Sequence, residues 1–167
     1  QWPKLTAGEK WMQDLDAAKL ETLIRRGYLG TGQVHVTIPR FSILKVPPGP
    51  DPELEPGDIR VVWDLSKNGV NKGMYTPGFA MPTLGTCLRR IETVTFAGDF
   101  DVGEQFHNYQ LHESERACHG TEIPRDLVNR LRAESIEVAK IMRWCRLPFG
   151  WQAAPYQALR MLARFSR

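Results

Sequence analysis

The chain has 167 residues, of which 42% are hydrophobic and 25% are charged. These proportions are ordinary for a globular protein and leave room for one domain with a hydrophobic core. No apolar run approaches the roughly 18 residues of a membrane-spanning helix, and no secretion signal opens the chain. The sequence therefore predicts an intracellular protein, cytoplasmic or nuclear, that does not enter a membrane.

Charge and cysteine content bear on the partners and the compartment. The net charge is +3, but from Pro124 onward nine Arg or Lys stand against three Asp or Glu, which leaves −3 for the first 123 residues. A basic C-terminal third suits a polyanion such as nucleic acid, although a solvated helix face would look the same. Three separated cysteines indicate reduced thiols, and the His and Cys residues between His107 and His119 match no zinc-ligand spacing.

The first half of the chain is predicted to hold two helices and a long hairpin. A capping-box spacing at Thr6–Glu9 precedes one helical pattern, and a second helix runs from Asp16 to Arg26 and ends at the following glycine. Alternating apolar residues make 33–46 extended. Five prolines and several acidic residues make 47–57 a loop, and 58–65 is the return strand.

The second half alternates helices and strands, which predicts an α+β fold with no Rossmann glycine pattern and no P-loop. The expected elements are a helix over 82–91, a buried strand over 93–101, a short helix or turn over 102–111, a strand over 117–123, a helix over 124–138, a strand over 140–147 and a helix over 151–165.

Two carboxylates lie at the end of the predicted strand over 93–101. Asp99 and Asp101 are two positions apart and therefore point to the same side of a strand. A buried unpaired carboxylate is costly, so such a pair would need a cation or a divalent metal. The alternative is an exposed strand end at which both side chains are hydrated.

Four blocks of the sequence, in order, resemble the reverse transcriptases of retroelements. FDVGEQFHNYQL resembles their first catalytic motif, and RLPFGWQAAPYQALRML resembles their second. FSILKV followed by DIRVVWDL resembles the hairpin of their fingers, and AAKLETLIRRGYLG resembles the helix and turn that enter the fingers. The resemblance implies a right-hand polymerase: a fingers-like region over 1–80 with N-terminal helices and a long β-hairpin, and an incomplete palm over 81–167 with helices packed on an antiparallel sheet.

The resemblance also implies a nucleotide site. Asp101 and the Val102 carbonyl would hold catalytic Mg²⁺ or Mn²⁺, with Asp99 as a candidate for a further ligand. Lys45 and Arg60 would clamp the triphosphate, because Arg offers a fork of donors to phosphate oxygens. Phe106 would lie under the sugar and exclude a 2′-hydroxyl. The other residues implied to contact the nucleotide are Glu104, Gln105 and Phe149, and those on the template side of the pocket are Gly150, Trp151, Gln152 and Pro155.

Each of these residues also has an alternative role that involves no ligand: Lys45 and Arg60 as surface cations, and Phe106 and Trp151 as aromatic residues of the core. The sequence also departs from the family. Phe149 stands where retroviral enzymes often carry Gln, the hairpin tip PPGPDPELEPGD is acidic, and two residues are inserted in DLSKNGVNK.

The function implied is template-directed deoxynucleotidyl transfer by two-metal catalysis, with deoxynucleoside triphosphates and an RNA or DNA template–primer as partners. No Tyr/Phe-x-Asp-Asp motif occurs in the chain. We therefore expect the rest of the palm and the thumb of the same polyprotein to be missing, and this chain alone not to polymerise. Two alternatives remain: a non-catalytic nucleic-acid-binding or interaction domain derived from such an enzyme, and an unrelated α+β binding protein.

Overall fold

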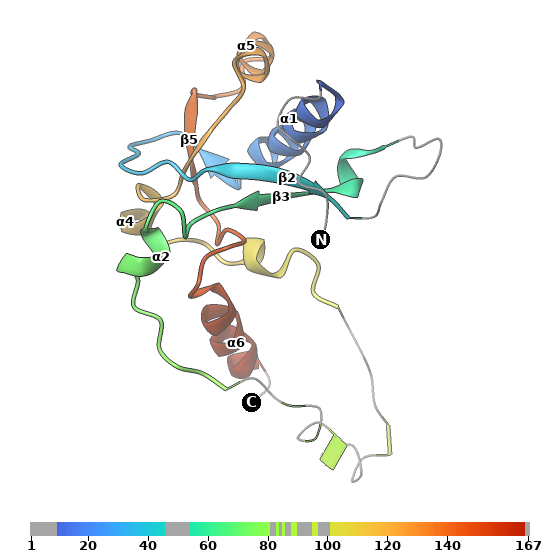
Figure 1. The fold of residues 1–167 in the computed structure, drawn as a ribbon, viewed down its shortest axis with the longest axis vertical. Helices are drawn as coiled ribbons and strands as arrows, with labels where there is room; N and C mark the ends of the chain where they lie inside the picture. Colours follow the sequence, from blue (N-terminus) through green and yellow to red (C-terminus); the bar gives the residue numbers. More distant parts are fainter. Residues whose placement is uncertain are drawn as a thin grey trace.

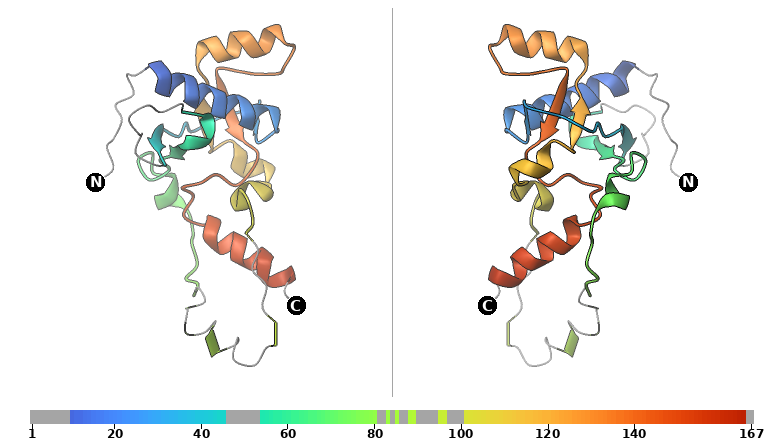
Figure 2. Two further views of the ribbon diagram at one scale, coloured as in Figure 1. Left: turned by 90° about the vertical axis from the view of Figure 1, so that its right-hand side faces the viewer. Right: turned by 90° about the vertical axis from the view of Figure 1, so that its left-hand side faces the viewer.

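The computed structural model describes residues 10–45, 54–80 and 101–165, together with residues 83, 85, 88, 89, 95 and 96. In these ranges the fold is α+β, with small antiparallel sheets and several helices. Figures 1 and 2 show helices α1 and α5 at one end of the molecule and α6 at the other, with the strands between them. No helix in the described part of the chain is long and apolar enough to span a lipid bilayer.

Helix α1, Lys10–Arg25, is continuous through the position where a second helix was predicted to begin. The predicted break at Asp16 is therefore wrong. An Asp that starts a helix accepts hydrogen bonds from the backbone of that helix, whereas the Asp16 carboxylate accepts them from Arg40 and Ser42 on a neighbouring strand. The predicted end of the helix is confirmed, because Gly27 adopts the left-handed conformation (φ +68°) that closes many helices.

The predicted hairpin is confirmed. Strands β2, Arg40–Leu44, and β3, Ile59–Trp63, pair antiparallel with Arg40 opposite Trp63 and Leu44 opposite Ile59. The 3₁₀ turn η1, Pro56–Asp58, leads into β3, and the short helix α2, Val70–Gly73, follows the hairpin. Side chains on one face of the hairpin pack into the core: Leu44, Ile59, Val61 and Trp63.

A three-stranded antiparallel sheet has the order β1-β5-β4. Its strands are β1 Leu29–Gly30, β4 Gly120–Glu122 and β5 Ile141–Trp144, and the surrounding helical elements are η2 Gln105–Asn108, α4 Glu113–Arg116, α5 Arg125–Ala133 and α6 Ala154–Phe165. The strands and helices predicted over 117–165 are thus confirmed, with shorter bounds. A parallel bridge between Thr37 and Gly120 connects this sheet to the chain entering the hairpin.

The buried apolar side chains form one cluster that draws on both halves of the chain. At its centre the ring of Trp63, from the hairpin, meets the ring of Trp144, from β5, edge to face at 4.7 Å. The predicted fingers-like and palm-like regions therefore share a core.

The strand predicted over 93–101 is not formed at its described residues. Thr95, Phe96 and Asp101 are exposed and lie outside any strand, and Phe96 is 91% exposed. The physical reason is that a strand requires a partner, and no described strand pairs with these residues. Asp99 and most of the helix predicted over 82–91 lie outside the described residues, although residues 85, 88 and 89 are helical.

Candidate functional site

The two cations predicted to clamp a triphosphate lie on the same face of the hairpin. Arg60 is directly opposite Ile43, and Lys45 is two residues beyond Ile43, so all three side chains point to the side away from the core. Diagonal neighbours of this kind lie roughly 7–8 Å apart. Both cations are exposed, and neither makes an ion pair or side-chain hydrogen bond with another described residue.

The segment that carries the predicted metal ligands is irregular. Asp101 is exposed and unpaired among the described residues, and Val102 is half-buried. Glu104 adopts a left-handed backbone (φ +50°), and its carboxylate forms an ion pair with Arg26 at 2.7 Å. Glu104 is thereby connected to the end of α1, and the next residue, Gln105, begins η2.

Phe106 and Phe149, both predicted to contact the nucleotide, lie together. Their ring centroids are 5.0 Å apart, and Phe149 remains 41% exposed. The ring of His107 stacks on Trp144 at 5.2 Å and meets Phe149 edge-on at 5.0 Å. Burial lowers the pKa of His107 to about 4, so this aromatic cluster is uncharged at neutral pH.

The turn of the second motif is held tightly against the end of β3. Gly150 has a φ of +98°, and a Cβ at this position would come within 2.4 Å of the Trp63 carbonyl oxygen. Trp151 is half-buried and its ring meets that of His119 edge-on at 5.6 Å. Gln152 is exposed, and Pro155 lies at the second position of α6.

Burial also lowers the pKa of His119. Its Nδ1 donates to the Glu115 carbonyl at 2.7 Å, which fixes the neutral tautomer with the proton on that nitrogen.

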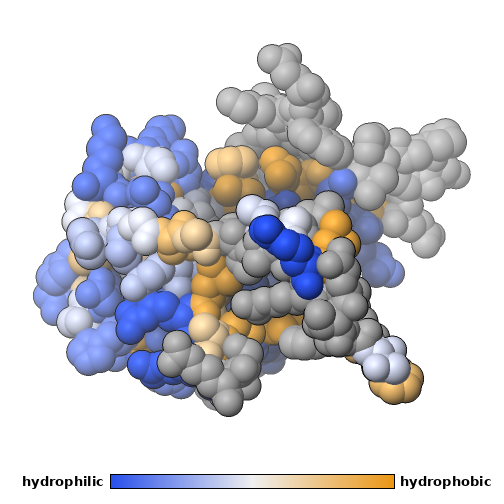
Figure 3. Space-filling view, turned by 90° about the horizontal axis from the view of Figure 1, so that it is seen from below, coloured by the Kyte–Doolittle hydropathy of each residue, from blue (hydrophilic) through white to orange (hydrophobic). Residues whose placement is uncertain are grey.

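No hydrogen bond or ion pair between described residues joins Asp101 to Lys45 or Arg60. The prediction that these three residues share one cleft stays a prediction. A cavity of about 670 Å³ lies beside the turn and is lined in part by Tyr75, Trp151 and Met161. Tyr75 is 85% exposed, and Figure 3 shows apolar side chains gathered on this lower side of the molecule.

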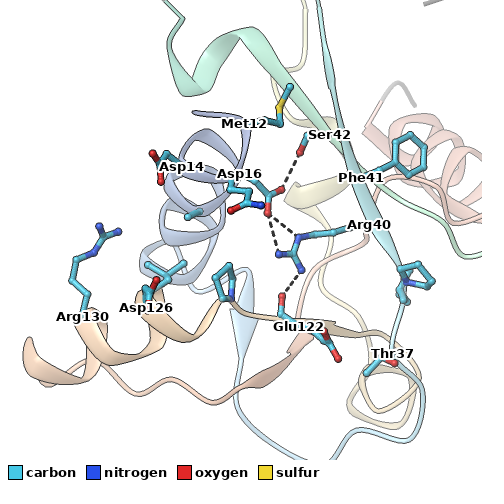
Figure 4. Close-up of a pocket in the computed structure, with 16 residues that line it drawn as sticks. Met12, Asp14, Asp16, Thr37, Arg40, Phe41, Ser42, Glu122, Asp126 and Arg130 are labelled. Carbon is cyan, nitrogen blue, oxygen red and sulfur yellow. Dashed lines mark hydrogen bonds and ion pairs between the residues drawn. The ribbon is translucent and has the colours of Figure 1, made fainter. Parts of the chain in front are cut away.

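A larger cavity of about 880 Å³ lies between α1, β2 and the start of α5. At its base, Arg40 donates from Nε and Nη2 to Asp16 at 3.1 and 3.0 Å, and from Nη1 to the Glu122 carbonyl. Figure 4 shows these groups pointing toward one another, whereas Phe41 points to the opposite side of β2. The network joins α1, β2 and β4, and we interpret it as structural.

The basic C-terminal third is partly neutralised within the molecule. Arg130 pairs with Glu21, and Arg143 pairs with Glu113 at 2.6 Å. Both acidic partners lie outside that third. Its surface is thus less positive than the sequence suggested.

The described carboxylates do not fit a pair of resident Mg²⁺ ions. Mg²⁺ prefers six oxygen ligands and is usually held by one or two carboxylates together with substrate phosphates. Among the residues that the structure describes, no group of three or more His, Cys, Asp or Glu is placed to hold a metal. Of the predicted metal ligands that the structure describes, only Asp101 supplies a carboxylate, which is too few for such a pair of ions.

One residue with a prominent role in the site was missed by the sequence analysis. Asn71 lies in DLSKNGVNK, where the sequence showed only a two-residue insertion, yet its side chain bonds to both sides of the Gly150–Gln152 turn. The sequence held no signal for this contact, because the partners are 79 and 81 residues away.

The chain matches no protein-family model and no curated protein sequence.

Proposed function

We propose that the described residues form the nucleotide- and template-binding part of a reverse transcriptase-like polymerase, built from its fingers hairpin and the first part of its palm. In the whole enzyme this part would hold the incoming deoxynucleoside triphosphate and the template–primer. The chain itself is proposed to bind these partners and not to extend a primer.

The observation that carries the proposal is that Lys45 and Arg60 are diagonal neighbours on the face of the hairpin that points away from the core. Two like charges placed side by side repel each other, and no described carboxylate neutralises either of them. Such a pair is favourable once a polyphosphate binds between the two side chains, because charge-assisted hydrogen bonds to phosphate are strong. The exposed Phe149, packed on Phe106, offers an aromatic surface to a base or sugar.

Titration of the chain with dATP and Mg²⁺ tests the proposal. Each charged hydrogen bond contributes about 1.5–3 kcal/mol, so Lys45→Ala and Arg60→Ala should each weaken binding by about tenfold or more. Deoxyadenosine monophosphate should bind more weakly than dATP, because it presents fewer phosphate oxygens to the two cations.

Lys140→Ala is the matched control, since Lys140 is an exposed cation that lies between α5 and β5. Its affinity for dATP should equal that of the unmodified chain. Binding that is unchanged in Lys45→Ala and Arg60→Ala, or lowered equally in Lys140→Ala, would argue against a triphosphate site on the hairpin.

A second candidate is a non-catalytic nucleic-acid-binding domain derived from such an enzyme. Such a domain needs no carboxylate cluster, and among the described residues no such cluster is placed to hold a metal. This candidate predicts phosphate binding that does not depend on Asp101, and the measurement that closes the Discussion separates the two.

A further inference from the structure

The loop that follows the hairpin is organised by side chains that bond to backbone. Asp64 accepts from the backbone N–H groups of Ser66 and Lys67 at 3.1 and 3.0 Å. Asn68 donates to the Thr37 carbonyl at 3.1 Å. The backbone N–H of Asn71 donates to the Leu65 carbonyl at 3.1 Å, so the loop folds back on the end of β3. Asn71 is therefore presented from a fixed backbone.

The Asn71 side chain uses its whole donor capacity and one acceptor position. Its Nδ2 donates to the Gly150 carbonyl and to the Ser66 hydroxyl, each at 3.1 Å, and its Oδ1 accepts from the Gln152 N–H at 3.0 Å. A carbonyl can only accept and an N–H can only donate, so these two partners fix the orientation of the amide. The Ser66 hydroxyl holds the second N–H and keeps the amide plane in place.

The two bonds to Gly150 and Gln152 imitate strand pairing. In a parallel ladder, one residue donates to a carbonyl and accepts from an N–H two positions further along its partner. The Asn71 amide makes the same pair of contacts from a side chain. Among common side chains of this length, Asn alone supplies both groups, because Asp lacks the donor and Leu lacks both.

We propose that Asn71 is a positioning residue that locks the Gly150–Gln152 turn onto the end of the hairpin and so sets the template side of the nucleotide site. The inference rests on the proposed function. Gln152 is exposed, so its backbone position decides where its side chain meets a ligand. Gly150 has no Cβ and fits against the Trp63 carbonyl, which lets the turn approach closely enough for Asn71 to reach it.

Two measurements on Asn71→Ala test the proposal. Hydrogen exchange at the Gln152 amide should become about tenfold faster, the equivalent of about 1.4 kcal/mol for a lost hydrogen bond. Affinity for a labelled DNA primer on an RNA template should fall by a similar factor. Affinity for dATP should change less than about twofold, because Lys45 and Arg60 are untouched; a general loss of structure would lower both affinities.

Three further variants show which hydrogen bonds of the Asn71 side chain are responsible for these changes. Asn71→Asp keeps the acceptor for Gln152 and loses the donors, so the Gln152 amide should stay protected while template–primer affinity falls. Ser66→Ala removes only the hydrogen bond between the Asn71 Nδ2 and the Ser66 hydroxyl. Its exchange rate at Gln152 and its template–primer affinity should lie between those of the unmodified chain and Asn71→Ala. Asn129→Ala, at an exposed position of α5, is the matched control and should change neither measurement. Asn71→Asp and Ser66→Ala carry the test if Asn71→Ala fails to fold.

The possible failures are distinguishable. An unchanged Gln152 amide in Asn71→Ala would overturn the locking contact itself. A faster amide with unchanged template–primer affinity would overturn the positioning role. If the unmodified chain binds neither dATP nor template–primer, the proposed function fails and the positioning role fails with it, whereas the exchange result still stands as a property of the fold.

Discussion

Replacing Gly150 with alanine is expected to lower the free energy of unfolding by several kcal/mol. Two penalties act at once. A left-handed φ of +98° is unfavourable for any residue with a Cβ, and the new methyl group would lie 2.4 Å from the Trp63 carbonyl oxygen. Backbone strain and overpacking each cost about 1–3 kcal/mol, so we expect a loss of roughly 2–6 kcal/mol in unfolding free energy.

Urea denaturation measures this change, and Gly73→Ala is its control. A Cβ at Gly73 meets nothing within 4 Å, and the residue ends the short helix α2. Alanine there should be neutral or stabilising by up to about 1 kcal/mol. Equal effects of the two substitutions would mean that the turn does not approach β3 as closely as the structure shows.

Arg40→Ala is the second substitution with a large expected effect. The side chains of Arg40 and Asp16 are each only 16% exposed, and Arg40 also donates to the Glu122 carbonyl. Its removal leaves the poorly hydrated Asp16 carboxylate with only the Ser42 hydroxyl as a donor, and it takes the side-chain donor from the Glu122 carbonyl. Breaking a fully buried pair costs about 3–5 kcal/mol, and partial exposure lowers the expected loss of unfolding free energy to about 2–3 kcal/mol.

Two comparisons isolate the cause of that loss. Arg26 pairs with Glu104 where both side chains are largely exposed, so Arg26→Ala should cost less than about 1 kcal/mol. The double variant Asp16→Leu with Arg40→Met should recover much of the stability lost in Arg40→Ala, because no charge is left unpaired. If the double variant is as unstable as Arg40→Ala, the loss comes from packing and not from an unpaired carboxylate.

The hairpin and the C-terminal elements could be predicted because their signals are local. Alternation in 33–46 and 58–65 matches a half-buried pair of strands, and a proline-rich loop separates them. Helix α5 buries Leu127, Val128 and Leu131, which are spaced as one face of a helix.

The errors arose where distant contacts decide the local structure. Asp16 looked like the start of a helix, but Arg40 and Ser42 take its carboxylate. Strand β1 has only two residues, and it exists because β5 pairs with it. The apolar stretch around Phe96 looked like a buried strand and is exposed at its described residues. The periodic pattern of apolar residues in the sequence predicts none of these outcomes.

In the candidate site, too, features with a local sequence signal could be predicted, and features that depend on distant contacts could not. The shared face of Lys45 and Arg60 follows from strand alternation once the register is known. The contact between Asn71 and the Gly150–Gln152 turn depends on how a loop closes over residues far along the chain, and no spacing rule encodes it.

The proposed function requires that Asp101 and the hairpin cations, Lys45 and Arg60, act on one bound nucleotide. The direct measurement is NMR line broadening by Mn²⁺ added with dATP, since Mn²⁺ takes the same oxygen ligands as Mg²⁺. We predict broadening at Val102 and Gly103 and at Lys45 and Arg60, which requires dATP and disappears from the first pair in Asp101→Asn. Broadening that ignores dATP, or that persists unchanged in Asp101→Asn, would contradict a polymerase-type nucleotide site in this chain.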